Sequence, residues 1–350
     1  MRRISFLFAA LLGLGALLRA APAGAMLVAD QPYRFDPTGR LVTDVYVNGQ
    51  GPLSFLIDTA SSRSLIFEHV RQKLGLSRSQ PEKLMVYGIN DVAEALPVKP
   101  DRITVAGQEV KDLTIGVLPE SSSADPDGIL GVDFLSHYFV VLDRATMQLK
   151  LLPPGEDSAR AYRDWSETTL TPRLLKKFPI RFWYLSTRFN DRAIETLFDL
   201  GAGTTMMNWY AAERLGVRKR NFTHFGPPPE ELQDVLGKTS PALRIENVEV
   251  RLHGKSWDNQ LVIVADAPVF NYFDLEDQAA AIAGPGLLRD TSLAIDFAGQ
   301  KLYIGPTIGG PEPPRPSRTQ VEVYDPDSRN GVNGHTPSGT GSCPWQGFRC

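Results

Sequence analysis

The chain has 350 residues, a length that allows about two domains of common size. Its 37 Lys and Arg against 40 Asp and Glu give a net charge of −3. This balance argues against nucleic-acid binding, because phosphate contacts need a basic surface. Glycine (30) and proline (27) are plentiful, which favours many short strands and turns over long helices.

Residues 1–25 have the layout of a secretory signal peptide. Arg2 and Arg3 form a positive start, an apolar run from Ile4 to Leu18 follows, and small residues lead up to Ala25. This run is short for a bilayer span of ~20 residues, so we expect cleavage after Ala25 rather than a membrane anchor. Removing the segment leaves 34 basic residues (37 − 3) against 40 acidic ones, a net charge of −6. We therefore expect an exported protein, periplasmic or secreted, with no membrane span in its mature form.

Short β-strands and turns dominate the residues that follow. Residues 45–47 run into Asn48-Gly49, a hairpin turn because both residues tolerate a positive φ. Residues 103–105 turn at Ala106-Gly107 into another strand, and residues 248–252 alternate as in a half-buried strand. Residues 261–264 form a short apolar run typical of a buried strand. The sequence therefore predicts an all-β protein with few short helices.

Two blocks of sequence repeat with a period near 150 residues. Residues 55–62 form an apolar strand that runs through Asp58 into small residues, and a helical stretch then ends at Gly75. Residues 196–203 do the same around Asp199, and their helical stretch ends at Gly216. Both offsets are 141 (199 − 58 and 216 − 75), and a register shared by two features indicates an internal repeat.

The end of each half repeats as well. Gly131 and Gly284 follow short apolar segments and precede strands that end at Asp143 and Asp296, so both offsets are 153 (284 − 131 and 296 − 143). Loops accommodate the 12 extra residues of the second half (153 − 141). These boundaries predict a first lobe over residues 26–152, an interlobe connection over residues 153–178 and a second lobe over residues 179–305.

The last part of the chain, residues 306–350, is rich in Pro, Gly, Ser and Arg and has almost no periodicity, so we expect a linker or a disordered tail. It carries the two cysteines of the chain, Cys343 and Cys350. In an oxidising compartment these could close a small disulfide loop, and a loose tail with two separate thiols is the alternative.

Asp58 and Asp199 each stand where an apolar strand meets small residues. One such aspartate is more often a helix cap or a turn former. Two equivalent halves packed about a pseudo-twofold axis, however, would bring two such turns and their carboxylates together. Two buried carboxylates in contact share a proton, so one acts as a base and the other as an acid. Such a pair can activate water against a peptide carbonyl without a metal or an organic cofactor.

These motifs resemble the retropepsin-like aspartic proteases, specifically exported bacterial members in which two such domains are fused. The family pattern is matched by residues 56–61 and 129–135 in the first half and by residues 197–202 and 282–284 in the second. The resemblance covers about residues 38–305. It implies a bilobal pair of pepsin- or retropepsin-like acid-protease barrels, an endopeptidase that acts on peptides or proteins, and no cofactor. Since both halves lie in one chain, a monomer could suffice.

The resemblance also assigns roles to individual residues. Asp58 and Asp199 would be catalytic, and Gly131 and Gly284 would brace the active-site loops. The loops themselves would comprise Thr59, Ala60 and Ser61 in the first half and Leu200, Gly201 and Ala202 in the second.

Two positions depart from the family pattern. Ala60 stands where the family has Gly, and Leu200 stands where it has Thr or Ser. In the family, hydroxyls at the latter position interlock across the axis, so Thr59 would lack its counterpart although a buried hydroxyl needs partners. These departures leave a second hypothesis open, a catalytically silent peptide-binding module on the same fold.

The family also closes a β-hairpin flap over its substrate. Tyr87 and Gly88, beginning 29 residues after Asp58 (87 − 58), are interpreted as the first flap tip, and an ordinary Tyr-Gly turn is the alternative. Gly237 is a weaker candidate for a second flap.

The sequence lacks the motifs of several other enzyme classes. There is no His-Glu-x-x-His and no Gly-x-Ser-x-Gly, and the five His show no zinc-ligand spacing. A glycosidase that uses Asp58 and Asp199 as separate acid and base is a third hypothesis, which requires carboxylates ~5 Å apart or more.

Overall fold

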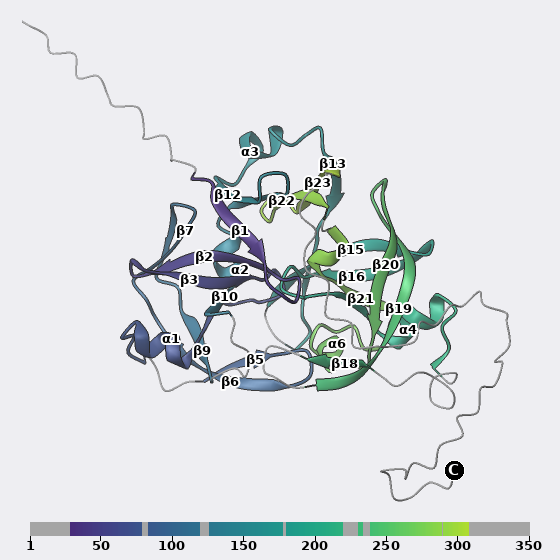
Figure 1. Cartoon of the computed structure of the whole chain (residues 1–350), viewed down its shortest axis with the longest axis horizontal. Helices are drawn as coiled ribbons and strands as arrows, with labels where there is room; N and C mark the ends of the chain where they lie inside the picture. The colour runs from purple at the N-terminus through teal and green to yellow at the C-terminus, as the bar shows by residue number, and fades with distance from the viewer. Residues whose placement is uncertain are drawn as a thin grey trace, which may run out of the picture.

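The computed structural model describes residues 29–78, 83–119, 126–177, 180–219, 230–233, 239–288 and 290–307. Most of these residues lie in β-strands, and the helices among them are short (Figure 1). The predicted all-β class is therefore confirmed. The predicted signal peptide, Gly237, and the tail from residue 308 with Cys343 and Cys350 lie outside the described residues.

The first half begins and ends in strands. Its strands are β1 (Gln31–Phe35), β2 (Leu41–Val47), β3 (Gln50–Ile57), β4 (Leu65–Phe67), β5 (Leu84–Tyr87), β6 (Val92–Val98), β7 (Arg102–Val105), β8 (Gln108–Lys111), β9 (Ile115–Leu118), β10 (Gly128–Leu130), β11 (Phe139–Asp143) and β12 (Gln148–Leu152). Its helices are α1 (Glu68–Lys73) and α2 (Val132–Leu135). The predicted connection contains α3 (Glu156–Arg160), β13 (Ser166–Thr169) and β14 (Thr171–Leu174), so much of it is regular structure.

The second half follows the same pattern. Its strands are β15 (Arg181–Phe189), β16 (Arg192–Phe198), β17 (Thr205–Met207), β18 (Glu230–Gln233), β19 (Thr239–Leu252), β20 (Lys255–Val264), β21 (Ala280–Ala283), β22 (Thr291–Asp296) and β23 (Lys301–Thr307). Its helices are α4 (Trp209–Arg214), α6 (Val269–Tyr272) and the 3₁₀ helix η1 (Pro285–Leu288).

The strands that lead to Asp58 and Asp199 have equivalent neighbours. β3 pairs in parallel with β10, β10 pairs antiparallel with β4, and β4 pairs in parallel with β9. In the second half, β16 pairs in parallel with β21, β21 pairs antiparallel with β17, and β17 pairs in parallel with β20. The sequence repeat thus coincides with a repeated strand arrangement.

The two halves meet through β11 and β22, which pair antiparallel. Val140 lies opposite Ile295, and Leu142 lies opposite Leu293. With the offset of 153, Leu293 is the counterpart of Val140 and Ile295 is the counterpart of Leu142. This exchange of partners is what a twofold relation between the strands produces.

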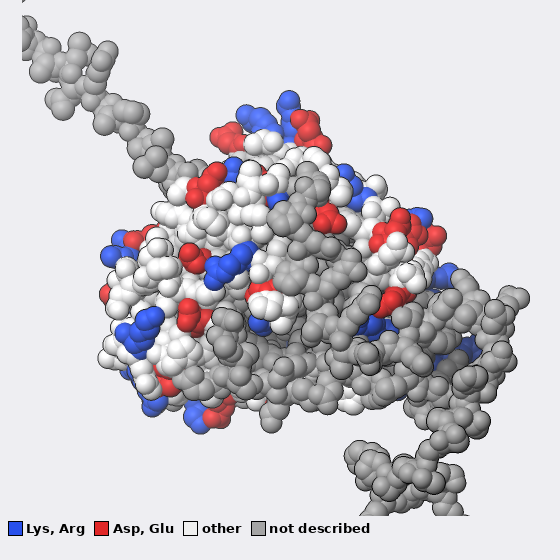
Figure 2. All heavy atoms as spheres, in the orientation of Figure 1, with Lys and Arg blue, Asp and Glu red and all other residues white. Residues whose placement is uncertain are grey.

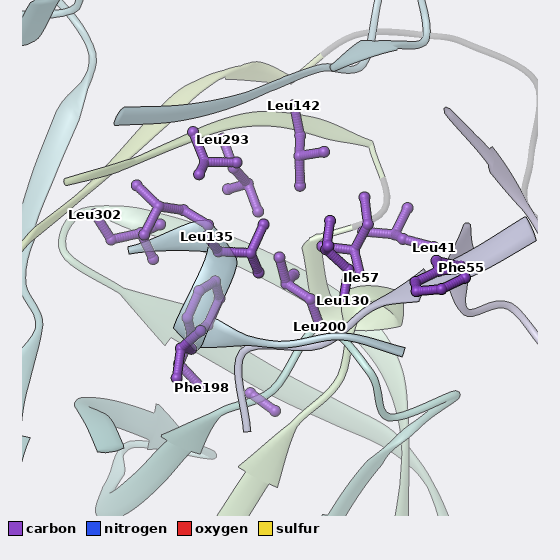
Figure 3. Packing of buried hydrophobic residues seen from close by; sticks show 14 of the residues in the cluster. Leu41, Phe55, Ile57, Leu130, Leu135, Leu142, Phe198, Leu200, Leu293 and Leu302 are labelled. Atoms are coloured by element: carbon purple, nitrogen blue, oxygen red, sulfur yellow. The ribbon is translucent and has the colours of Figure 1, made fainter. Parts of the chain in front are cut away.

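Buried apolar side chains extend across both halves. The main cluster includes Ile57 and Leu130 from the first half and Phe198 and Leu200 from the second (Figure 3). Each fully buried aliphatic or aromatic side chain of this kind contributes roughly 1.5–3 kcal/mol to folding. Since β3 and β16 both end in this shared cluster, its packing determines how close the two aspartate turns lie.

The face of the molecule in Figure 2 carries basic and acidic side chains interspersed among neutral ones. In the part of the chain that the structure describes, no helix is both long and apolar enough to cross a membrane. The same residues contain no cluster of three or more His, Cys, Asp or Glu suited to a metal ion.

Candidate active site

Each aspartate follows a strand whose neighbour holds its backbone. The Asp58 amide donates to the Leu130 carbonyl at 3.0 Å, and the Asp199 amide donates to the Ala283 carbonyl at 3.1 Å. These acceptors end β10 and β21, the parallel partners of β3 and β16. The ladder therefore continues one residue beyond each strand and fixes both aspartates in the same way.

The residues after each aspartate turn their amides back to its carboxylate. The Ala60 N–H donates to Asp58 Oδ1 at 2.8 Å, and the Gly201 N–H donates to Asp199 Oδ1 at 2.8 Å. Small side chains at these positions allow the backbone to approach so closely. The loops are therefore equivalent in hydrogen bonding although their sequences differ.

The two carboxylates meet across the halves and share a hydrogen bond. Gly201 packs directly on Asp58, since a Cβ added to Gly201 would lie 2.5 Å from Asp58 Cγ and 2.6 Å from Oδ2. Only glycine fits at position 201 with the carboxylates in this arrangement. A glycosidase would need the two groups separated around a sugar-sized cleft, so the contact is incompatible with that hypothesis.

The surroundings raise the pKa values of both carboxyl groups. Burial raises the pKa of Asp58 to about 6, although the N–H groups of Ala60 and Ser61, the hydrogen bond from Asp199 and the positive charge of Arg40 act in the opposite direction. Burial raises the pKa of Asp199 well above its ordinary value, and the negative charge of Asp58 raises it further. Both pKa values are thus raised, so the pair retains a shared proton, because two buried carboxylates in contact cannot both ionise cheaply.

Thr59 ties the two loops together. Its buried hydroxyl donates to the Phe198 carbonyl at 2.8 Å and accepts from the Leu200 N–H at 3.0 Å. The hydroxyl counterpart expected from the family is missing, but the hydroxyl that is present bonds to the opposite backbone. Leu200 is 1% exposed and packs in the main apolar cluster (Figure 3).

The second departure from the family pattern is also accommodated. Ala60 packs against the edge of a second apolar cluster, which includes Phe270 and Ile282 of the other half. Its methyl group therefore lies in an apolar environment, whereas Gly201, at the equivalent position 141 residues later, has no space for one.

Gly131 and Gly284 lie against the backbone of the loops that follow Asp58 and Asp199. A Cβ on Gly131 would lie 2.9 Å from the Ser61 carbonyl oxygen, and a Cβ on Gly284 would lie 2.7 Å from that of Ala202. In addition, the Val132 N–H donates to the Ser61 carbonyl at 2.9 Å. Because neither glycine has a side chain, the segment after each one can pack directly on the backbone of the neighbouring aspartate loop.

A half-buried carboxylate outside the dyad braces the first loop, and sequence reasoning missed it. Asp133 accepts from the Ser64 N–H at 2.9 Å and from its hydroxyl at 2.8 Å, and the same hydroxyl accepts from Gly131 N–H at 3.1 Å. Burial raises the pKa of Asp133. In the second half, Thr205 replaces Ser64 (205 − 64 = 141) and Gly286 replaces Asp133 (286 − 133 = 153). The buried Thr205 hydroxyl has no partner among the described residues.

The predicted first flap is a hairpin formed by β5 and β6, with Tyr87 paired to Val92 at its end. Gly88 begins the turn, and its N–H donates to the Asp91 carbonyl at 2.8 Å. Tyr87 packs on Tyr272 of α6 with the ring centroids 4.6 Å apart. The hairpin thus contacts the other half of the molecule.

The tip of this hairpin is also hydrogen-bonded to the second half. The Ile89 carbonyl accepts from the Val269 N–H at 3.1 Å. The Asn90 side chain donates to the Leu232 carbonyl at 2.8 Å and accepts from the Ser240 hydroxyl at 2.7 Å. Leu232 and Ser240 belong to β18 and β19, and Figure 1 shows β18 beside β5 and β6. No motif in the sequence indicated this role for Asn90 or α6.

A turn near the N-terminus also reaches the second loop. Asp36 accepts from the backbone and side chain of Thr38 and forms an ion pair with Arg40 at 2.6 Å. A Cβ on Gly203 would lie 2.8 Å from the Thr38 carbonyl oxygen, so this turn packs on the loop that follows Asp199. Arg40 is thereby held close enough to act on the charge of Asp58.

A β-rich fold in which two strand-end aspartates share a hydrogen bond has the features of the aspartic proteases. Residues 43–134 match the family model described as aspartyl protease. The match includes Asp58, its loop, the β5–β6 hairpin and Gly131, and it ends before the second half. No curated protein matches the chain.

Proposed function

We propose that the protein is an aspartic-type endopeptidase built from two fused retropepsin-like lobes, each of which supplies one carboxylate. The observation that carries this proposal is the hydrogen-bonded pair of Asp58 and Asp199, held by equivalent strands and equivalent loop amides. The family match of residues 43–134 supports it for the first half, and the repeated strand pairing supports it for the second.

In the proposed reaction, Asp58 starts as the carboxylate and Asp199 as the carboxylic acid of the pair. The Asp58 carboxylate takes a proton from a water molecule, whose oxygen then forms a bond to the carbonyl carbon of the scissile peptide. Asp199 gives its proton to the carbonyl oxygen. When the tetrahedral intermediate collapses, the C–N bond breaks, Asp58 gives its proton to the leaving nitrogen, and a hydroxyl of the intermediate returns a proton to Asp199.

The β5–β6 hairpin would act as a lid over this pair. Its contacts with Val269, Leu232 and Ser240 must be exchanged for contacts with a peptide when substrate enters. Closing such a lid excludes water and strengthens the electrostatic effect of nearby charges. We therefore propose a peptide or protein substrate that binds in extended form beneath the hairpin.

The test is cleavage of a mixed peptide library by the mature chain between pH 3 and pH 7. Asp58→Asn and Asp199→Asn should each abolish cleavage. Asp157→Asn serves as the matched control, because its side chain is 97% exposed and its removal should leave the rate unchanged. Persistence of cleavage in either dyad variant would contradict the proposal.

The catalytically silent peptide-binding module remains the second candidate, favoured by Ala60 and Leu200 at positions where the family has other residues. Peptide binding by the wild type and by both dyad variants, with no cleavage at any pH tested, would favour this module. We also propose that the mature protein acts outside the cytoplasm, supported by the composition of residues 1–25 alone. N-terminal sequencing of the mature protein tests the expected cleavage after Ala25.

A further inference from the structure

A hollow of about 620 Å³ lies on the second half, where the β15–β16 and β19–β20 hairpins end side by side. Its lining is polar and includes Arg188, Arg251, His253 and Lys255. None of these residues belongs to the carboxylate pair, its loops or the β5–β6 hairpin. The hollow is therefore a feature that the proposed peptidase chemistry does not use.

The floor of the hollow is one row of residues across four strands. Ala193 of β16 lies opposite Arg188 of β15, Arg188 lies opposite Arg251 of β19, and Arg251 lies opposite Ser256 of β20. Directly paired residues point to the same face of a sheet. Two arginine side chains therefore stand next to each other, and the small side chains of Ala193 and Ser256 flank them and leave space above the row.

Two like charges directly opposite each other on paired strands destabilise a sheet, so a compensating interaction is expected. Asp191 supplies part of it. Its carbonyl accepts from Arg188 Nη1 at 2.8 Å, and its carboxylate accepts from Arg251 Nη1 at 2.7 Å. Glu249, outside the hollow, accepts from Arg251 Nε at 2.7 Å. These bonds orient both guanidinium groups.

Donor capacity remains after these contacts. A guanidinium carries five N–H donors, whereas Arg188 uses one nitrogen here and Arg251 uses two. Lys255 also lines the hollow and forms no ion pair within the described residues. The carboxylates of Asp191, Glu249 and Asp258 all act on the charge of Arg251. What the hollow offers to a ligand is therefore the remaining N–H donors of the two guanidinium groups and the ammonium of Lys255, not an excess of positive charge.

The equivalent row of the first half shows that the fold does not require arginines at these positions. There, Tyr46 of β2 lies opposite Thr104 of β7, and Thr104 lies opposite Glu109 of β8. The same strand arrangement thus carries no basic residue at those three positions. The arginine pair is a property of the second half alone.

We infer that this hollow binds an oxyanion, the phosphate or carboxylate group of a ligand. A planar guanidinium matches two acceptor oxygens at once, and two adjacent guanidiniums suit a group that offers several. Lys255 adds a point charge at the edge. The site is separate from the carboxylate pair, so its occupancy does not depend on whether the chain cleaves peptides.

The experiment is titration of the full-length protein with inorganic phosphate and, in a separate arm, with acetate, followed through the NMR signals of the His253 imidazole. Sodium chloride at matched ionic strength controls for general screening. Arg188→Gln and Arg251→Gln each remove one of the two guanidinium groups proposed to bind the oxyanion, and both positions are exposed. Arg192→Gln is the matched control, because Arg192 is exposed in the same hairpin but does not line the hollow.

We expect saturable shifts in the wild type and in Arg192→Gln, with an affinity at least about tenfold weaker in Arg188→Gln and Arg251→Gln, as the loss of charged hydrogen bonds predicts. A response to phosphate alone identifies a phosphate group as the ligand, and a response to acetate alone identifies a carboxylate. Shifts that are absent, that chloride reproduces, or that both arginine variants retain at full affinity overturn the inference.

Discussion

Thr59 and Phe198 belong to different halves of the chain, yet the hydroxyl of the first donates to the carbonyl of the second at 2.8 Å. The same hydroxyl accepts from the amide of Leu200, so a single side chain holds the residues on both sides of Asp199. The hydroxyl that links the backbones of the two aspartate loops thus comes from the first loop alone. Leu200 contributes apolar packing where a second hydroxyl could have contributed hydrogen bonds.

Replacing Thr59 with valine should destabilise the junction between the halves. Thr59→Val keeps the shape of the side chain but leaves a buried carbonyl and a buried N–H without their partner, which costs about 2–4 kcal/mol of unfolding free energy. Thr59→Ser retains the hydroxyl and loses one methyl group, at a cost of about 1 kcal/mol. Chemical denaturation of both variants measures the difference. Equal losses would show that the hydroxyl contributes nothing beyond its volume.

Gly201 and Gly286 provide a matched pair for the geometry of the dyad. Gly201→Ala would place a methyl group 2.5 Å from Asp58 Cγ and force the two carboxylates apart, whereas an added Cβ at Gly286 has no atom within 4 Å. A displacement of about 1 Å at reacting groups costs roughly 100-fold in rate. Steady-state assays should therefore show a loss of that size for Gly201→Ala and an unchanged rate for Gly286→Ala. A normal rate in Gly201→Ala would mean that the close pair is not needed.

The sequence was informative wherever a pattern repeated. The shared offsets around Asp58 and Asp199 predicted equivalent turns, and in the structure both aspartates are bonded in the same way to β10 and β21. The apolar segments before Gly131 and Gly284 became the strands that support the loops. These features follow from local patterns of apolar and small residues, which single-sequence reading detects well.

Contacts between distant segments were not predictable in this way. Asn90 is an ordinary turn residue in the sequence, and its role depends on where Leu232 and Ser240 lie in three dimensions. The partners of the Thr59 hydroxyl are backbone groups, which leave no trace in side-chain identity. The sequence did contain a sign of the role of Asp133, because its counterpart Gly286 breaks the repeat. This difference can be interpreted only when the structure shows Asp133 beside the first aspartate loop.

The dyad should make folding stability depend on pH. Burial raises the pKa of Asp58 to about 6 from 3.8, so the native state binds more protons than the unfolded chain between these values. Stability therefore falls as pH rises through this range, by about 3 kcal/mol for Asp58 alone at 1.36 kcal/mol per pH unit, and further as Asp199 ionises. The double variant Asp58→Asn/Asp199→Asn lacks this dependence.

Unfolding free energies at pH 4 and pH 8 measure the effect. The double variant should become more stable relative to the wild type by about 3 kcal/mol or more between the two values. Asp157→Asn, with its side chain almost fully exposed, should follow the wild type. If the unfolding free energy of the double variant changes with pH as that of the wild type does, the two carboxylates are not buried together in solution.

Ser64 and Thr205 should respond in opposite ways to the loss of a hydroxyl. Ser64→Ala deprives the half-buried Asp133 carboxylate and the buried Gly131 N–H of a partner, at a cost of about 2–3 kcal/mol. Thr205→Val removes a buried hydroxyl that has no partner among the described residues, so its stability should change by less than about 0.5 kcal/mol or increase. Thermal and chemical unfolding test both variants. A large loss in Thr205→Val would indicate an internal water or another partner.

The side chain of Asn90 should control how often the β5–β6 hairpin opens. Asn90→Ala removes both hydrogen bonds to β18 and β19, and a loss of about 1.4 kcal/mol would raise the open population about tenfold. Hydrogen exchange of the Gly88 and Val92 amides, followed by mass spectrometry or NMR, should accelerate accordingly. Asn271→Ala, an exposed position in the contacting helix α6, is the control and should leave exchange unchanged. Identical exchange rates in the wild type and in Asn90→Ala would contradict this prediction. The contacts with Val269 and Tyr272 would then be what keeps the hairpin closed.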